Sequence, residues 1–167
     1  MTQVGITTPG NRALRRGRVS LAGGAYVVTT VTQARRPLFA DWSRGRLLVA
    51  EMRRLHEAGW VNSLAFVVMP DHLHWLFVLG GERCMEEVIR RLKGRSARAL
   101  NAAAGRTGRV WQPGFHDHGV RREEDLRVLA RYVVANPLRA GLVERLADYP
   151  LWDAVWLDRG VSSEESL

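Results

Sequence analysis

The pattern of apolar and polar residues along the chain predicts three strands and two helices before residue 105. Some runs are rich in β-branched and aromatic residues, which is typical of strands. In others, apolar residues recur at helical spacing. The predicted strands occupy 25–33, 61–69 and 72–79, and the predicted helices occupy 41–60 and 85–104.

The residues that follow predict a short fourth strand and a third helix. The stretch 115–121 (FHDHGVR) has the length of a strand. The helix is expected to open at Glu123–Glu124–Asp125, because acidic side chains in a first turn suit the helix dipole. It runs toward Asn136, since Pro137 disfavours a helical conformation in the residue before it.

The resulting order, β-α-β-β-α-β-α, predicts an α+β fold of the ferredoxin-like (split βαβ) type. We expect an antiparallel sheet with helices on one face and the other face free for a ligand or partner. The chain divides into a basic N-terminal arm (1–18), a single domain (19–157) and a polar C-terminal tail (158–167).

The charge balance indicates a polyanionic partner. Twenty-five basic and 17 acidic side chains give a formal net charge of +8, and such an excess favours nucleic acid, although it also aids solubility. Lys93 is the one lysine; the other basic side chains are arginines, which suit bidentate phosphate contacts.

Cysteine usage and hydropathy point to a cytoplasmic, nucleoid-associated protein. The single Cys84 excludes a disulfide within the chain and a metal site built from cysteines. No apolar run approaches the ~18 residues that span a membrane.

Two histidines interrupt the apolar run "HLHWLFVL". His72 and His74 are two residues apart, so in a strand they project from the same face while Leu73 points to the other. Two neighbouring imidazoles are able to hold one divalent metal ion. A pair that merely forms hydrogen bonds at a sheet surface is the simpler alternative.

The last predicted helix offers a third ligand and a nucleophile. Tyr132 and Asn136 lie one helical turn apart on one flank of its apolar stripe. If this flank covers the histidine face, the Asn136 amide oxygen completes a three-ligand site. Alternatively, Tyr132 is a half-buried aromatic residue and Asn136 ends the helix before Pro137.

Such a site suits phosphodiester chemistry. Two neutral imidazoles and a neutral amide leave the charge of a divalent ion uncompensated, which makes the ion a strong Lewis acid toward phosphate. A tyrosine hydroxyl, with a pKa of about 10 in its unperturbed state, would form a covalent phosphotyrosine and release a sugar hydroxyl. Because the phosphoester is retained, the strand can be rejoined without ATP.

Three segments resemble the single-tyrosine HUH transposases (IS200-like), and in particular their REP-associated tyrosine transposase branch. They are "PDHLHWLFVL", "VWQPGFHDHGVR" and "RYVVANPLRAGLV", in this order, within a likeness that covers about residues 15–152. The resemblance implies that His72, His74 and Asn136 hold Mg²⁺ or Mn²⁺. It also implies that Tyr132 attacks single-stranded DNA and leaves a 5′-phosphotyrosine and a free 3′-OH.

The same resemblance implies a partner and an oligomeric state. Hairpin-forming repetitive extragenic palindromes (REP elements) are the expected DNA substrate. Small relatives in the wider family build shared active sites as dimers, so a homodimer stays open, but the REP-associated branch favours a monomer.

Further basic, aromatic and polar residues are candidates for DNA contacts. The helix 85–104 carries a basic face, with a plain solvated helix as the alternative. Trp111 either stacks on bases or belongs to the core, and His116 and His118 form a second pair for which no third ligand is evident. The candidate DNA-binding residues are Arg90, Arg91, Lys93, Arg95, Arg98, Trp111, Gln112, His118 and Arg121.

Two other functions fit parts of the pattern. One is a phosphodiesterase that uses water; its histidine-triad form would need a histidine at position 76, where the chain has Leu76. The other is a catalytically idle DNA-binding regulator that keeps the fold and the charge.

Overall fold

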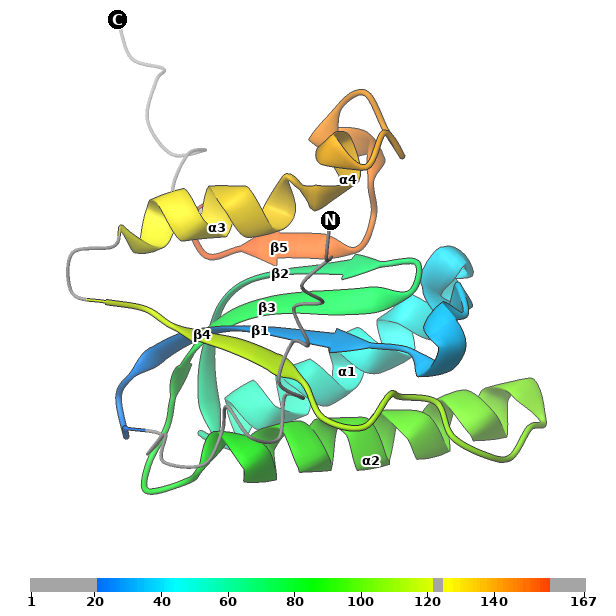
Figure 1. The fold of residues 1–167 in the computed structure, drawn as a ribbon, viewed down its shortest axis with the longest axis horizontal. Helices are drawn as coiled ribbons and strands as arrows, with labels where there is room; N and C mark the ends of the chain where they lie inside the picture. The colour runs from blue at the N-terminus through cyan, green and yellow to red at the C-terminus, as the bar shows by residue number, and fades with distance from the viewer. Residues whose placement is uncertain (1–20, 122–124, 157–167) are drawn as a thin grey trace, which may run out of the picture.

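The computed structural model describes residues 21–121 and 125–156, which form one α+β unit (Figure 1). Its five-stranded antiparallel sheet has the order β4-β1-β3-β2-β5. The first four strands in this order have the split βαβ arrangement, so the predicted fold class is confirmed. The strands are β1 (Ala25–Val31), β2 (Val61–Met69), β3 (His72–Leu79), β4 (His116–Gly119) and β5 (Trp152–Ala154).

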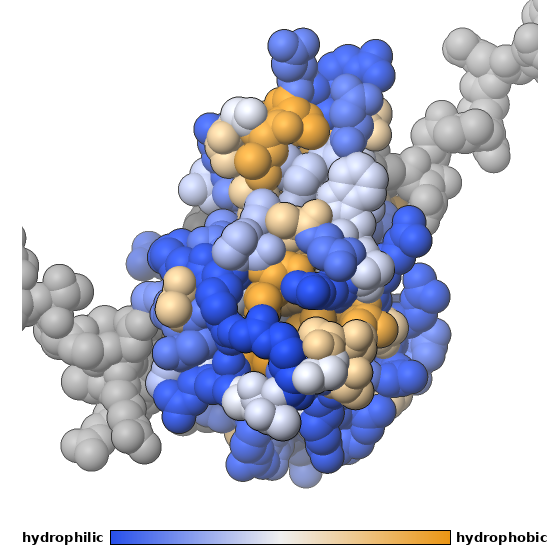
Figure 2. All heavy atoms as spheres, turned by 90° about the vertical axis from the view of Figure 1, so that its right-hand side faces the viewer, coloured by the Kyte–Doolittle hydropathy of each residue, from blue (hydrophilic) through white to orange (hydrophobic). Residues whose placement is uncertain are grey.

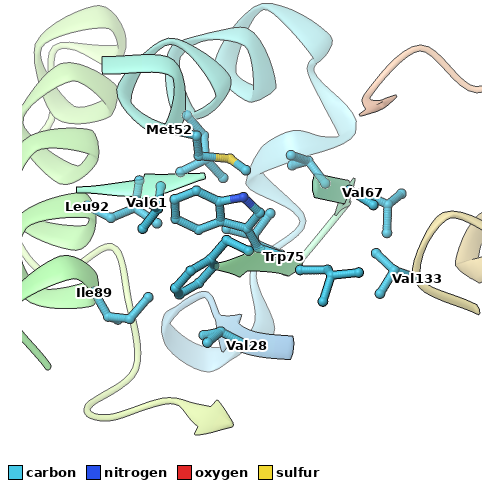
Figure 3. Packing of buried hydrophobic residues seen from close by; sticks show 14 of the residues in the cluster. Val28, Met52, Val61, Val67, Trp75, Ile89, Leu92 and Val133 are labelled. Carbon is cyan, nitrogen blue, oxygen red and sulfur yellow. The ribbon is translucent and has the colours of Figure 1, made fainter. Parts of the chain in front are cut away.

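Two long helices cover one face of the sheet (Figure 1). They are α1 (Trp42–Glu57), between β1 and β2, and α2 (Met85–Ala104), between β3 and β4. Trp75 projects from β3 toward this face and packs among Met52, Val61 and Leu92 (Figure 3). Its indole nitrogen donates to Ser63 Oγ at 2.9 Å, so the polar edge of this fully buried ring is satisfied.

The opposite face is partly covered by α3 (Leu126–Val134), which contacts β2, β3 and β5. The buried side of α3 includes Val133, which lies on the side of the sheet where Val67 projects (Figure 3). The face that we expected to be free is therefore open mainly over β1 and β4.

The third helix ends earlier than predicted, at Val134. Ala135 caps it, and a short second helix, α4 (Asn136–Arg139), starts with Pro137 in its first turn. Proline suits this position because a first-turn N–H has no partner within a helix. At the other end, Asp125 is the N-cap and accepts from the backbone N–H of Arg127 at 2.7 Å; Glu123 and Glu124 lie outside the described residues, as do the arm 1–18 and the tail 158–167.

Strand β5 was not predicted. It has three residues, too few for a visible alternation, and it pairs with β2 across a long sequence separation. Tyr149 anchors the segment before it by donating its hydroxyl to Val68 O at 2.6 Å.

The remaining regular elements are three short 3₁₀ turns. They span Gln33–Arg35, Leu38–Ala40 and Leu146–Asp148. No helix within the described ranges has the length and apolar character needed to cross a membrane. Seen from the end at the right of Figure 1, the surface is mainly hydrophilic, with separate apolar patches (Figure 2).

Candidate functional site

His72 and His74 converge at the start of β3. Their Nε2 atoms are 3.1 Å apart, and their rings meet edge to face with centroids 4.7 Å apart. Both side chains are half-buried and lie on the sheet face that α3 partly covers, as their position two residues apart predicts.

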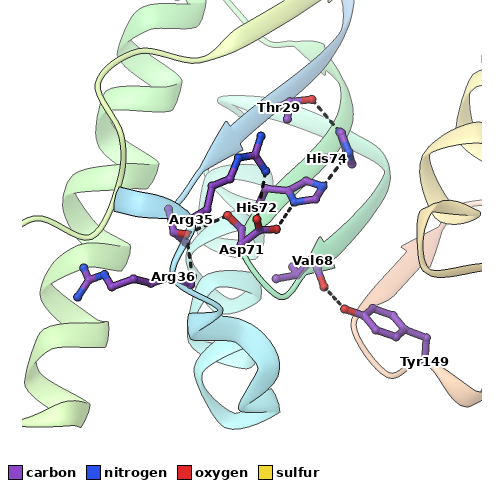
Figure 4. Close-up of polar contacts among 9 residues, drawn as sticks. Thr29, Arg35, Arg36, Val68, Asp71, His72, His74 and Tyr149 are labelled. Atoms are coloured by element: carbon purple, nitrogen blue, oxygen red, sulfur yellow. Dashed lines mark hydrogen bonds and ion pairs between the residues drawn. The ribbon is translucent and has the colours of Figure 1, made fainter. Parts of the chain in front are cut away.

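The other nitrogen of each ring is held by a protein group (Figure 4). His72 Nδ1 contacts Asp71 Oδ1 at 2.5 Å, and Arg35 donates to the second oxygen of Asp71 at 3.1 Å. His74 Nδ1 contacts Thr29 Oγ1 at 2.7 Å. Asp71 is the sequence neighbour of His72, whereas Thr29 is distant in sequence from His74. The sequence analysis missed Thr29, because only the strand register pairs it with His74.

The electrostatics of this cluster favour a neutral His74. Burial, together with the positive charges of His72 and Arg139, lowers the pKa of His74 to about 4. Partial burial raises the pKa of Asp71, but its contacts with His72 and Arg35 outweigh this and bring the pKa below its ordinary value. At neutral pH, His74 therefore keeps a lone pair on its ring, and Asp71 is ionised.

The donor set fits a divalent metal ion. With Asp71 and Thr29 accepting from the two Nδ1–H groups, both Nε2 lone pairs face a common point. Two ligands at neighbouring positions of an octahedral ion, each about 2.1 Å from it, are about 3.0 Å apart, close to the observed 3.1 Å. Among the described residues no group of three His, Cys, Asp or Glu side chains could hold a metal, so a third protein ligand from these residues would be of another type.

Asn136 is the candidate for that ligand. It is half-buried at the start of α4, and its amide nitrogen donates to Val133 O at 2.7 Å. The helix backbone therefore engages the amide nitrogen of Asn136. The amide oxygen, which is the atom that binds metals, is not engaged by this contact. Arg139, one turn further on, is close enough to His74 for its charge to lower the histidine pKa.

Tyr132 lies on the exposed flank of α3, and its side chain is 61% exposed. The guanidinium of Arg139 lies over its ring at 3.9 Å and donates to Tyr132 O at 2.9 Å. The other two tyrosines use their hydroxyl groups within the fold: Tyr26 accepts from Leu21 N and Tyr149 donates to Val68 O. In the described part of the chain, no hydrogen bond engages the Tyr132 hydroxyl, which leaves it available for a substrate.

The basic residues of α2 lie on the other face of the sheet, and several have partners within the fold. Arg95 Nε contacts Glu51 at 2.7 Å, and Lys93 donates to the carbonyl oxygens of Gln112 (2.8 Å) and Gly114. Arg91 lies over the Trp60 ring at 4.7 Å, Arg98 donates to Gly94 O at 3.3 Å, and Arg90 is exposed. Their contacts with DNA stay a prediction.

Trp111 is buried, which corrects the expectation that its ring stacks on bases. The side chain is 4% exposed, its indole nitrogen donates to Ser96 Oγ at 3.0 Å, and its ring packs against Phe39. The alternative interpretation of Trp111 as a core residue is the one confirmed. The neighbouring Gln112 is half-buried.

His116 and His118 lie on the edge strand β4, and both are exposed, as is Arg121 beyond it. Thr29 of β1 pairs with His116 on one side and with His74 on the other. His116 therefore projects from the same face as His74, two strands away. The sequence did not reveal this relation, because it requires the strand order.

The comparisons with known proteins show the family of the chain. The model of the family described as "Transposase IS200 like" matches residues 21–136. The chain belongs to the IS200-like transposase family.

Two relatives of this transposase are REP-associated tyrosine transposases by name, as the sequence resemblance implied. The protein from Escherichia coli (strain K12) is 30% identical over 87 residues, 52% of this chain and 50% of that protein. The chain therefore aligns with about half of the length of this relative. A candidate REP-associated tyrosine transposase of Haemophilus influenzae (strain ATCC 51907 / DSM 11121 / KW20 / Rd) is 27% identical over 143 residues, 77% of this chain and 78% of that protein.

Solved structures show the same fold. A REP-associated tyrosine transposase bound to a REP hairpin matches with a TM-score of 0.67 and 25% identity, covering 81% of this chain and 79% of that one. A transposase from Deinococcus radiodurans matches with a TM-score of 0.51 and 22% identity, covering 72% and 95% of the two chains, and this likeness concerns the fold.

Proposed function

We propose that this IS200-like transposase is a metal-dependent endonuclease and strand transferase that cleaves hairpin-forming, REP-like single-stranded DNA. The observation that carries the proposal is the convergence of the His72 and His74 Nε2 atoms, 3.1 Å apart, on the sheet face that α3 partly covers. Tyr132 belongs to α3, and Asn136 begins the adjoining helix α4. The relatives named for REP elements, and the match to a structure bound to a REP hairpin, support the choice of substrate.

His72, His74 and Asn136 would hold Mg²⁺ or Mn²⁺. When bound, the ion supplies Lewis-acid activation of the phosphodiester. Asp71 and Thr29 keep the imidazoles in the tautomer whose Nε2 lone pairs are free, through their contacts with the two Nδ1 atoms. The low pKa of His74 keeps this ring neutral at physiological pH.

The Tyr132 hydroxyl would attack the phosphorus atom. A bond forms between the tyrosine oxygen and phosphorus, the bond from phosphorus to the 3′-oxygen of the preceding nucleotide breaks, and that oxygen leaves as a 3′-OH carrying the proton lost by tyrosine. The product is a 5′-phosphotyrosine. Arg139 lies over the Tyr132 ring and adds positive charge beside the phosphate.

The first prediction concerns this covalent product. Wild-type protein incubated with Mn²⁺ and a labelled DNA hairpin carrying single-stranded flanks is expected to give a protein–DNA adduct on a denaturing gel. Tyr132→Phe removes the nucleophilic oxygen and should abolish the adduct. Tyr26→Phe is the matched control and should keep it, because the Tyr26 hydroxyl serves a local backbone contact.

The same gel distinguishes the alternatives. Cleavage that survives Tyr132→Phe would identify a water-using phosphodiesterase and contradict the proposal. Binding without cleavage by the wild type, in either metal, would identify an idle DNA-binding regulator. Whether the protein acts as a monomer or as a homodimer stays a prediction, for which light scattering of the DNA complex is the measurement.

A further inference from the structure

The loop 108–115 runs beside α2, away from the histidine pair (Figure 1). Residues of α2 and of this loop line a cleft. Its volume is about 430 Å³, within the range of small-molecule pockets. Its walls combine apolar and basic side chains. Those used below are Glu86, Arg90, Gly94, Ala97 and Arg109.

The cleft is held open by contacts that fix the loop. Lys93 of α2 donates to two loop carbonyls, those of Gln112 and Gly114. Asn101 Nδ2 donates to Gly108 O at 2.9 Å, and Arg36 Nη2 donates to Arg109 O at 2.7 Å. Because these contacts order the loop in advance, a ligand would lose little free energy in arranging it.

Gly94 forms part of the helical wall of this cleft. It lies in the middle of α2, where glycine costs about 1 kcal/mol of stability relative to alanine. A Cβ added at Gly94 would meet nothing within 4 Å, so no packing contact requires a glycine there. The α2 helix is continuous through Gly94. What the glycine provides is a flat patch of helix surface that opens onto the cleft.

Charge indicates the ligand class. Arg90 and Arg109 are exposed residues of the two opposite walls, whereas Glu86 is the one acidic residue of the lining. A lining that combines small apolar residues with two exposed arginines suits a planar base with its phosphates. A base paired within a duplex cannot enter such a cleft, because it is stacked and its edges are engaged.

We propose that this cleft binds one unpaired nucleotide of the DNA, with the base against Gly94 and Ala97 and the phosphates at Arg90 and Arg109. The proposal rests on the proposed DNA substrate. The cleft would be a second contact point on the DNA, separate from the histidine site. The two are connected through the fold, since the loop 108–115 leads directly into β4, the edge strand two strands from His74.

The test measures DNA affinity by fluorescence anisotropy in a Tyr132→Phe background, so that no cleavage interferes. The two labelled probes are a hairpin with unpaired flanking nucleotides and a fully paired duplex of the same length. Gly94→Leu fills the flat patch and should weaken binding of the first probe about tenfold or more, while leaving the duplex unchanged. Arg90→Gln should also weaken binding of the first probe, because it removes a contact with the phosphates of the unpaired nucleotide.

Ala103→Leu is the matched control. Ala103 is an exposed residue of the same helix that does not line the cleft, so this variant should bind like the parent protein. Gly94→Leu should melt at the same or a higher temperature than the parent, since leucine favours a helix more than glycine; weaker binding therefore cannot be attributed to unfolding. Unchanged affinity in Gly94→Leu, or equal loss on both probes, would overturn the proposal.

Failure of this proposal is separable from failure of the proposed function. The adduct gel reports Tyr132 chemistry whatever the affinity of Gly94→Leu. Conversely, if Gly94→Leu weakened binding of the hairpin probe alone, the cleft proposal would be supported even if no covalent adduct formed.

Discussion

At the scale of single residues, the histidine site depends on groups that do not themselves ligate. Thr29 Oγ1 lies 2.7 Å from His74 Nδ1, and Asp71 lies 2.5 Å from His72 Nδ1. Each contact fixes the orientation of one imidazole, and together they keep the two Nε2 atoms convergent (Figure 4). Thr29 is therefore a positioning residue for the proposed metal ligand His74.

We predict that Thr29→Val weakens Mn²⁺ binding about 10- to 100-fold, because valine has the same shape but cannot accept from His74 Nδ1. Isothermal titration calorimetry on the DNA-free protein measures the affinity directly. Thr30→Val is the matched control: Thr30 points to the other sheet face, and in the described part of the structure its buried hydroxyl has no hydrogen-bond partner. Equal Mn²⁺ affinity in the two variants would contradict a positioning role for Thr29.

At the scale of elements, α1 and α2 are joined by a buried carboxylate. Glu51 of α1 is 5% exposed and contacts both Arg54 of its own helix and Arg95 of α2. A buried carboxylate without partners would be costly, so Arg95 has a role in holding the helix pair together. This role is separate from the DNA contact predicted for it.

We therefore predict that Arg95→Gln lowers the free energy of unfolding by about 1–2 kcal/mol. The loss is moderate because Arg54 remains as a partner and because the Arg95 side chain is 39% exposed. Urea denaturation measures it. Arg98→Gln on the same helix should change stability by less than about 0.5 kcal/mol. An equal effect of the two substitutions would argue against a role of the Arg95–Glu51 contact in joining α1 and α2.

At the scale of the whole molecule, the sheet is completed by a segment distant in sequence. β5 joins the edge of β2, Leu151 O accepts from Val68 N at 2.8 Å, and Tyr149 donates to Val68 O. The Tyr149 side chain is 7% exposed, and burial raises its pKa to about 12. Because α3 contacts β5 as well as β2 and β3, this closure also supports the helix that carries Tyr132.

The raised pKa of Tyr149 predicts a loss of stability at high pH. The folded state holds the phenolic proton more tightly than the unfolded state, in which the pKa is about 10. The stabilisation by Tyr149 is thus complete below pH 10 and is lost as pH rises through about 12. The urea midpoint of the wild type should therefore fall as the pH is raised from 10 to about 12. Tyr149→Phe should be about 1 kcal/mol less stable than the wild type below pH 10, and its midpoint should fall less over the same pH range. An equally steep fall in the variant would contradict this assignment.

Local patterns account for most of the elements that were predicted correctly. The β-branched runs and the helical spacing of apolar residues in the helices 41–60 and 85–104 reflect side-chain geometry within a few residues. The short β5 and the split between α3 and α4 escaped prediction, because one depends on pairing with β2 and the other on a cap at Ala135.

The sequence by itself determined the order of the strands and long helices as far as α3. It also determined the common face of His72 and His74, since the alternation of a strand requires no partner. It also contained Tyr132 and Asn136 one turn apart, together with the motifs that identify the family. Tertiary structure alone decided that Thr29 contacts His74, that Trp111 is buried, and that Gly94 faces a cleft. These relations join residues that are distant in the chain, so they exist only once strand register and helix packing bring them together.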